Sequence, residues 1–300
     1  MASTGPGRVT AYVLMGDPAY LEQSLAAYYP YVDRIVVSYD SSHTSWTGTP
    51  LPIDQCLQIV DEVDVDRKCV RAPGAFARLD QQALANDTHQ RQVALDQASE
   101  GADWVLQLDT DEVMASPERF FDTLRQADEA GAAGLDYPSR WIYSRVCEGH
   151  YLVACDRFLR PVSSYPGPLA VRAGTQLKHA RQADVDLFRV DFRATSTDPW
   201  RPRDAQVDAV VNAGEAVLHF SWVRDPEAIK RKFGWSGHHA AMGAPKVYRD
   251  WAWGTRHPVL TTFAAPFRRA VDGRYCLTRL PEPPGGIPPR VNFSDTDGLA

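Results

Sequence analysis

The first half of the chain alternates short apolar runs with segments of helical periodicity, and this alternation constrains the fold more than any other feature. Residues 8–15, 34–39 and 104–108 are apolar enough to form buried strands, and 68–71 is a shorter run of the same kind. The pattern predicts helices over 19–29, 57–63 and 84–98. Strands and helices in this order predict an α/β fold, a mostly parallel sheet flanked by helices, with right-handed crossovers.

The second half of the chain is less regular. Strand-like runs cover residues 135–143, 151–158 and 217–220. Asp225 followed by Pro226 is a typical helix start, because the aspartate can cap the N-terminus and proline suits the first helical position. The predicted helix runs toward His238 and His239. Residues 280–289 are too rich in proline to form a helix or a central strand. We place a soft boundary near residue 140, which divides one continuous domain into halves 1–140 and 141–300 that share one sheet.

Composition excludes several classes of protein. The chain has 300 residues, of which 44% are hydrophobic and 23% charged, so it has enough apolar side chains for a globular core. A formal net charge of −6 argues against nucleic acid as a partner, since phosphates require a basic surface. No apolar run approaches the ~18 residues of a membrane span, and the N-terminus lacks the pattern of a signal peptide. Five cysteines without a C-x-x-C pair suggest reduced thiols, so we expect a cytoplasmic protein.

Acidic residues follow several of the expected strands. Asp17, Asp40, Asp109 and Asp111 all lie at carboxyl ends, where ligands bind in parallel sheets. Two carboxylates one residue apart at the mouth of a buried strand are costly unless positive charge lies between them. A divalent cation is the favoured source of that charge, and a basic side chain is the other. Oxygen ligands suit Mg²⁺ or Mn²⁺, completed by phosphate oxygens and water. The alternative is a pair of solvated acids in a turn.

Around this pair, the stretch 103–113 (DWVLQLDTDEV) resembles the D-x-D segment of family-2-like glycosyltransferases of the GT-A fold. Residues 86–95 (NDTHQRQVAL) resemble the helix that precedes it in those enzymes, with an arginine near the diphosphate. A second strand that ends on Asp40 also matches, and residues 219–224 (HFSWVR) resemble the segment that returns a histidine to the metal. In one respect the sequence departs from this family. We find no Glu-Asp pair at a position that would match the pair supplying the catalytic base in those enzymes.

The resemblance implies a GT-A-like fold, with a Rossmann-like half 1–140 that binds the nucleotide sugar and a mixed acceptor-side half 141–300. It implies a metal-dependent glycosyltransferase that moves a sugar from a UDP-, GDP- or dTDP-sugar to a soluble acceptor, a small molecule or a sugar. Asp111 is then a metal ligand together with His219, and Asp109 touches the donor or the metal. Asp40 holds the base or ribose. Arg91 approaches the diphosphate or braces the D-x-D loop.

Several of these residues have plainer interpretations. His219 lies in an apolar run, where a lone histidine is commonly a core residue. The plainer interpretation of Arg91 is a surface cation on a helix. The segment 45–48 either folds over the donor or is an ordinary turn. Aromatic candidates for the acceptor pocket, or for the core, are Trp141, Tyr143, Trp222, Trp235, Trp251 and Trp253. Candidates for the catalytic base, by position only, are Asp156, Asp184, Asp186 and Asp191.

Other functions remain open. A haloacid-dehalogenase-type phosphatase would use Asp109 as nucleophile and Asp111 as acid/base, but it needs a later lysine and a downstream acidic pair. Lys178 is available, and no such acidic pair follows it. A nucleotidyltransferase would have a glycine-rich phosphate loop, which residues 15–18 do not supply. A non-catalytic nucleotide- or carbohydrate-binding protein is the alternative outside catalysis.

Overall fold

A computed structural model describes residues 6–235, 244–268 and 273–280 and shows an α/β protein. The helices are α1 (Leu21–Tyr28), α2 (Ile53–Val63), α3 (Ala83–Ser99), α4 (Pro117–Glu129), α5 (Pro226–Trp235), α6 (Ala244–Arg256) and α7 (Pro258–Ala264). The first strands are β1 (Val9–Leu14), β2 (Arg34–Asp40), β3 (Cys69–Gly74), β4 (Trp104–Gln107), β5 (Glu112–Met114), β6 (Gly134–Asp136) and β7 (Ser139–Cys147). The later ones are β8 (His150–Ala154), β9 (Ala170–Arg172), β10 (Leu177–His179), β11 (Gln182–Ala183), β12 (Leu187–Asp191), β13 (Ala209–Val210), β14 (Val217–His219) and β15 (Tyr275–Arg279).

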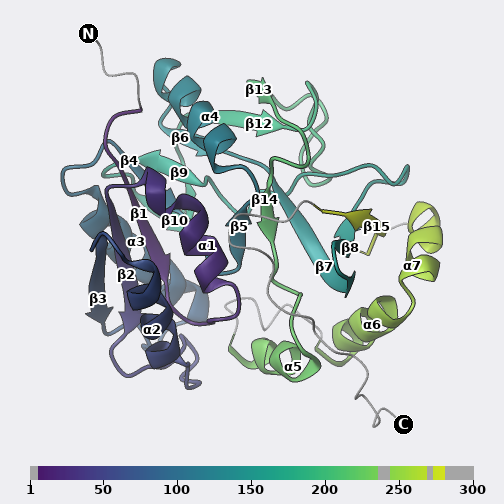
Figure 1. The fold of residues 1–300 in the computed structure, drawn as a ribbon, viewed down its shortest axis with the longest axis horizontal. Coiled ribbons are helices and arrows are strands. Elements are labelled where there is room, and N and C mark those ends of the chain that lie inside the picture. Colours follow the sequence, from purple (N-terminus) through teal and green to yellow (C-terminus); the bar gives the residue numbers. More distant parts are fainter. Residues whose placement is uncertain (1–5, 236–243, 269–272, 281–300) are drawn as a thin grey trace.

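The largest sheet has eight strands in the order β13-β12-β6-β9-β4-β1-β2-β3. Neighbouring strands run parallel except at β9, which is antiparallel to both β4 and β6. The sheet is therefore mixed, and it takes strands from both halves of the chain (Figure 1).

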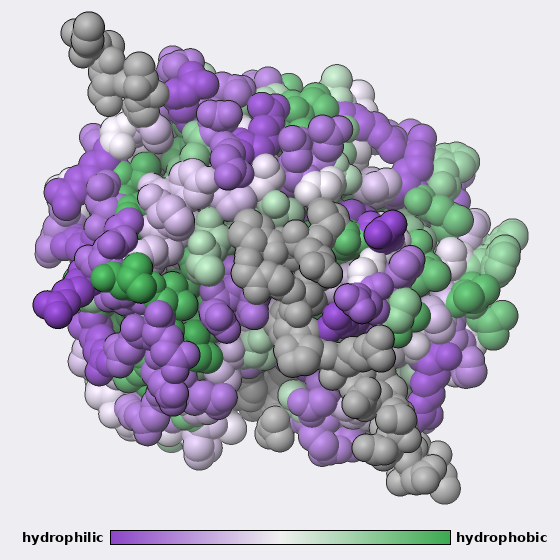
Figure 2. All heavy atoms as spheres, viewed as in Figure 1, coloured by the Kyte–Doolittle hydropathy of each residue, from purple (hydrophilic) through white to green (hydrophobic). Residues whose placement is uncertain are grey.

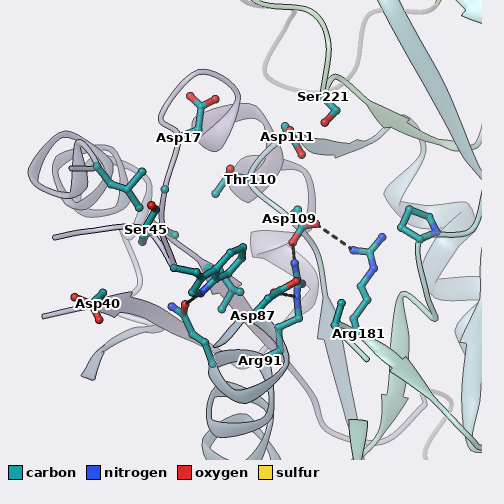
Figure 3. A pocket seen from close by; sticks show the side chains of 18 of the residues that line it. Asp17, Asp40, Ser45, Asp87, Arg91, Asp109, Thr110, Asp111, Arg181 and Ser221 are labelled. Atoms are coloured by element: carbon teal, nitrogen blue, oxygen red, sulfur yellow. Dashed lines mark hydrogen bonds and ion pairs between the residues drawn. The ribbon is translucent and has the colours of Figure 1, made fainter. Parts of the chain in front are cut away.

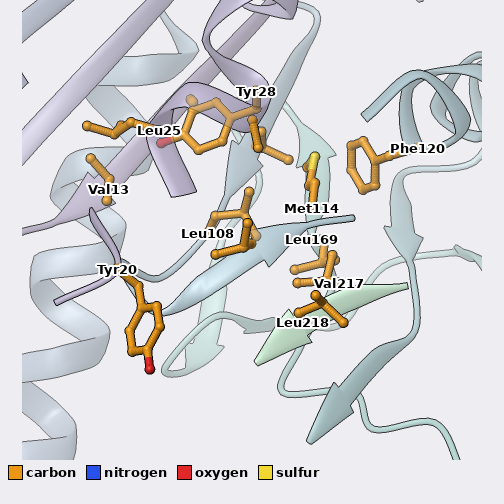
Figure 4. Close-up of a cluster of buried hydrophobic side chains, with 14 of the residues drawn as sticks. Val13, Tyr20, Leu25, Tyr28, Leu108, Met114, Phe120, Leu169, Val217 and Leu218 are labelled. Carbon is orange, nitrogen blue, oxygen red and sulfur yellow. The ribbon is translucent and has the colours of Figure 1, made fainter. Parts of the chain in front are cut away.

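Helices cover both faces of this sheet because its central strands are apolar on both sides. In β1, Ala11 and Val13 join the large core cluster under α1, α2 and α4, whereas Tyr12 and Leu14 join a smaller cluster under α3. Alternate residues of a strand point to opposite faces, so a run of apolar residues needs cover on each. The large cluster continues beyond the sheet to Leu218 of β14 (Figure 4).

A second sheet of five strands has the order β15-β8-β7-β14-β5 and lies beside the first (Figure 1). In it β14 runs antiparallel to β5 and parallel to β7, so His219 is opposite Glu112 on one side and Trp141 on the other. Helices α6 and α7 pack against this sheet through β7 and β15. The pairing of β14 with β5 brings residues 217–219 next to the D-x-D segment.

The outer surface is mainly hydrophilic in the view of Figure 2. Hydrophobic side chains gather at the edge over α7 (Figure 2), where Val259, Leu260 and Phe263 are exposed, as is Phe267 just after the helix. None of the described helices combines the length and the apolar character needed to cross a membrane. Among the described cysteines all are free thiols, and Cys147 is exposed.

The expected α/β class is confirmed, and each strand and helix expected in the first half is present. Two expected strands are wrong in extent. Residues 135–143 belong to β6 and β7, which lie in different sheets, with Tyr137 and Pro138 between them. The strand expected over 151–158 ends at Ala154, because Asp156 accepts backbone hydrogen bonds from Phe158 and Arg160 and closes a turn.

Other elements were not expected from the sequence, among them α4, α6, α7 and the short strands β9 to β13. Residues 281–289 of the proline-rich segment lie outside the described residues. His238, His239 and the side chain of Trp235 lie outside them as well.

Candidate functional site

A cavity opens at the carboxyl ends of β1, β2 and β4, where the acidic residues were expected to meet (Figure 3). Its lining includes Asp17, Asp40, Ser45, Trp46, Asp87, Gln90, Arg91, Asp109, Thr110, Asp111, Arg181, His219 and Ser221. All five residues predicted for the donor and metal sites therefore line one cavity. The structure shows how their charges are balanced.

Asp109 lies between two arginines. Arg91 Nη2 donates to Asp109 Oδ1 at 2.8 Å, and Arg181 Nη1 lies 4.0 Å from Asp109 Oδ2 (Figure 3). Arg91 is itself held by Asp87 one helical turn earlier in α3, at 2.7 Å. Burial on its own would raise the pKa of Asp109, but Arg91 and Arg181 outweigh it and keep that pKa below its usual value. Asp109 is therefore held as an anion.

Arg181 is a site residue that sequence reasoning missed. It forms a two-pronged ion pair with Glu112, with Nη1 to Oε2 at 2.5 Å and Nη2 to Oε1 at 2.6 Å, and both side chains are buried. Glu112 Oε2 also accepts the backbone N–H of Asp109 at 3.0 Å. Glu112 thus orients both the D-x-D loop and the guanidinium beside it. Arg181 lies between two very short strands, and no local pattern there points to a site.

Asp111 faces a different set of basic groups. His219 Nε2 lies 3.6 Å from Asp111 Oδ1, and Arg224 Nη2 lies 3.3 Å from Oδ2. Arg224 also binds Asp17 through Nε at 2.8 Å and donates to the carbonyl oxygen of Phe220. The residues after β14 therefore connect Asp111 to Asp17 at the end of β1.

Basic side chains lie near both carboxylates, as in the second of the two options for balancing their charge, and a divalent cation stays a prediction. Within the described residues, no group of three or more His, Cys, Asp or Glu side chains is arranged to hold a metal ion. Asp111 and His219 are spaced for a shared cation, because ligands at about 2.0–2.2 Å from one metal lie about 3–4 Å apart. Such an ion would take its remaining ligands from phosphate oxygens and water.

Asp40 lines the cavity, but its carboxylate also has a structural role. Its Oδ2 accepts the backbone N–H groups of Phe76 and Ala77 at 2.6 and 2.7 Å, and its Oδ1 accepts that of Ser42 at 2.9 Å. Burial on its own would raise the pKa of Asp40. The hydrogen bond from the Ser42 hydroxyl and those from the three backbone N–H groups outweigh burial and bring that pKa below its usual value. Asp40 thus holds together two loops at the rim, and its contact with a nucleoside stays a prediction.

The loop after β2 contributes an aromatic side chain to the cavity. Ser45 and Trp46 both line it, and Trp46 Nε1 donates to Gln90 Oε1 of α3 at 2.7 Å. Gln90 in turn donates to Ser38 Oγ on β2. The segment is also a turn, closed by a hydrogen bond from the N–H of Gly48 to the carbonyl of Ser45. The expectation of a turn at residues 45–48 is therefore confirmed, and a position of this segment over a donor stays a prediction.

Three of the aromatic candidates line a second cavity, of about 660 Å³, beside the first. Trp141, Tyr143 and Trp222 contribute to its wall, with Tyr275 stacked on Tyr143 at a ring distance of 3.9 Å. We call this the aromatic cavity. The ring of Trp141 also lies 6.3 Å from that of His219, which connects it to the first cavity. Trp251 is a core residue that donates to the carbonyl of Tyr143, and Trp253 is partly exposed outside both cavities.

None of the four aspartates suggested for the catalytic base lines the first cavity. Asp156 pairs with Arg160, and Asp184 is exposed and pairs with Lys178. Asp191 is buried and accepts hydrogen bonds from Ser163 and Thr197. Their assignment by sequence position alone receives no support from the geometry.

Comparison with known proteins does not assign the chain to a family. No protein-family model matches the chain, and no curated protein is significantly similar to it.

Proposed function

We propose that this protein is a metal-dependent glycosyltransferase of GT-A type, which moves a sugar from a nucleotide-sugar donor to a small-molecule or sugar acceptor. One observation carries the proposal. The pairing of β14 with β5 places His219 beside Asp111, in the cavity that also contains Asp109, Arg91 and Arg181. These are the groups needed to bind a metal-bound diphosphate at the end of a parallel sheet.

The charges of the cavity suit the two ends of such a donor. Arg91 and Arg181 offer guanidinium groups to phosphate oxygens, while Asp87 and Glu112 fix their orientation. Asp111 and His219 would hold Mg²⁺ or Mn²⁺, which stabilises the negative charge that develops on the leaving diphosphate. Arg224 holds Asp111 in place from the opposite side and links it to Asp17.

The aromatic cavity is the natural place for the acceptor. Trp141 borders it and faces His219, so an acceptor there would lie next to the reacting end of the donor. Aromatic ring faces suit sugars and other ring-shaped molecules. Transfer therefore takes place between the two cavities in this proposal.

A thermal-shift experiment tests the donor site. UDP-, GDP- and dTDP-sugars are each added with and without Mn²⁺ to the wild type and to Asp111→Asn, His219→Gln and Asp184→Asn. A ligand at ~100 times its Kd stabilises a protein by about 2.7 kcal/mol, which is a clear shift in Tm. One nucleotide class should stabilise the wild type and the control Asp184→Asn only with metal, and the two site variants should lose this effect.

A second candidate is a non-catalytic nucleotide- or carbohydrate-binding protein. The observation that favours it is the pairing of both D-x-D carboxylates with arginines, which balances their charge without a metal ion. Stabilisation by a nucleotide sugar that needs neither metal nor Asp111, with no nucleoside diphosphate released, would establish this function instead. The phosphatase alternative gains no support, because no lysine lines the cavity within the described part of the chain and Lys178 pairs with Asp184 at the surface.

A further inference from the structure

A third cavity, of about 380 Å³, adjoins the aromatic cavity and is lined by an unusual number of arginines. They come from three segments of the chain and are Arg157, Arg160, Arg193, Arg201, Arg203 and Arg274. The only carboxylates in its described lining are Asp156 and Asp198. We call this cavity the arginine pocket. Its excess of positive charge is notable in a chain whose net charge is −6.

The ion pairs of the fold account for only part of this charge. Arg160 binds Asp156 at 2.8 Å, and Arg201 binds Asp136 at 2.6 Å. Among the described residues, no ion pair joins Arg157, Arg193 or Arg203 to a carboxylate. Like charges gathered without counter-charges repel each other, so a cluster of this kind indicates an anionic ligand.

The chemistry of the lining favours an oxyanion. Guanidinium groups match phosphate oxygens in pairs, more closely than an ammonium does. Hydroxyl groups of Thr195 and Ser196 lie in the same wall and add neutral donors. The pocket therefore fits a phosphate group better than an uncharged one.

The arginine pocket is continuous with the aromatic cavity. Cys155, Val162, Pro199 and Arg274 line both of them. A single molecule could therefore place a ring against Trp141 and Tyr143 and an anionic group among the arginines. The aromatic cavity in turn meets the first cavity at Trp141 and His219.

We propose that the arginine pocket binds the phosphate group of the acceptor, so that the acceptor is a phosphorylated, ring-bearing molecule. The assignment to an acceptor rests on the proposed glycosyl transfer, whereas the anion site itself does not. In this arrangement the phosphate anchors one end of the molecule and the aromatic cavity orients its ring toward His219.

Calorimetric titration with inorganic phosphate at constant ionic strength tests the anion site. The double variant Arg193→Gln/Arg203→Gln removes two cations that support no ion pair of the fold. The control is Arg67→Gln, which lies between α2 and β3 and lines none of the three cavities. We expect the double variant to bind phosphate roughly tenfold more weakly or worse, with Arg67→Gln unchanged. Phosphate affinity that is the same in wild type and double variant overturns the proposal.

Phenyl phosphate tests the connection to the aromatic cavity. It should bind more tightly than inorganic phosphate, and Trp141→Ala should remove this advantage while it leaves inorganic phosphate unaffected. Equal affinities for the two probes in the wild type would overturn the link to the acceptor. Because neither titration contains a nucleotide sugar or a metal, failure here is distinct from failure of the donor-site experiment.

Discussion

At the scale of single residues, the site depends on buried charges that hold one another in place. Glu112 is fully buried and Arg181 nearly so, and their ion pair lies directly behind Asp109. Burial on its own would lower the pKa of Arg181, but the adjacent Glu112 outweighs it and raises that pKa. The pair is a structural support for the D-x-D loop, since Glu112 also accepts the N–H of Asp109.

Arg181→Met should therefore strongly destabilise the protein. It leaves the Glu112 carboxylate buried without its partner, which costs about 3–5 kcal/mol. The matched control is Arg71→Met, which breaks an exposed pair with Asp61 and should cost less than about 1 kcal/mol. Urea unfolding measures both. A loss in Arg181→Met no larger than in the control would show that the buried pair is not a support.

Asp40→Asn should produce a loss of stability that depends on pH. Because the folded-state pKa of Asp40 is lowered, its contribution is complete above the unfolded value near 4 and is lost as the pH falls through the folded value. We expect the variant to be about 1–3 kcal/mol less stable at pH 7, with the difference shrinking below about pH 4. Urea unfolding at pH 7, 5 and 3.5 measures it, and a difference independent of pH would contradict the assignment.

At the scale of elements, the loop before β9 determines where Arg181 lies. Gly167 has φ of +148° and passes so close to Arg181 that a Cβ would lie 2.7 Å from its Cγ and 3.1 Å from its carbonyl oxygen. A side chain at 167 would therefore have to displace the backbone of Arg181. The segment that carries Arg181 depends on a glycine for its position.

Gly167→Ala should destabilise the protein by about 1–3 kcal/mol through strain and displacement, and it should weaken donor binding. Gly214→Ala is the control, since that glycine has no left-handed φ and open space around its Cβ position. Thermal unfolding and donor titration follow the two variants. Wild-type stability and donor affinity in Gly167→Ala would refute this role for the loop.

At the scale of the whole molecule, the two halves of the chain are interleaved. β9 and β12, from the second half, complete the eight-stranded sheet, and β5, from the first half, is an edge strand of the second sheet. The large hydrophobic cluster extends across both sheets. Two smaller clusters, around Trp251 and around Cys276, lie wholly within residues 141–300. The main core takes side chains from both halves, so the boundary near residue 140 does not separate two folding units.

We therefore expect cooperative unfolding of the entire protein. Fluorescence and circular dichroism should report one coincident transition in urea. A fragment of residues 1–140 should remain unfolded, because it lacks β9, the strand that pairs with both β4 and β6. Two resolved transitions, or a folded fragment, would contradict this expectation.

The amino-acid sequence alone determined the α/β class, the central strands and the placement of Asp109 and Asp111 at a strand end. These features depend on local periodicity and on apolar runs, which short-range sterics and burial translate directly into strands and helices. Only the tertiary structure decided which distant segments meet. Arg181 is 69 residues from Glu112, and Arg224 is 113 residues from Asp111. Their contacts arise from the packing of the whole core, because no local pattern encodes which buried charges become partners.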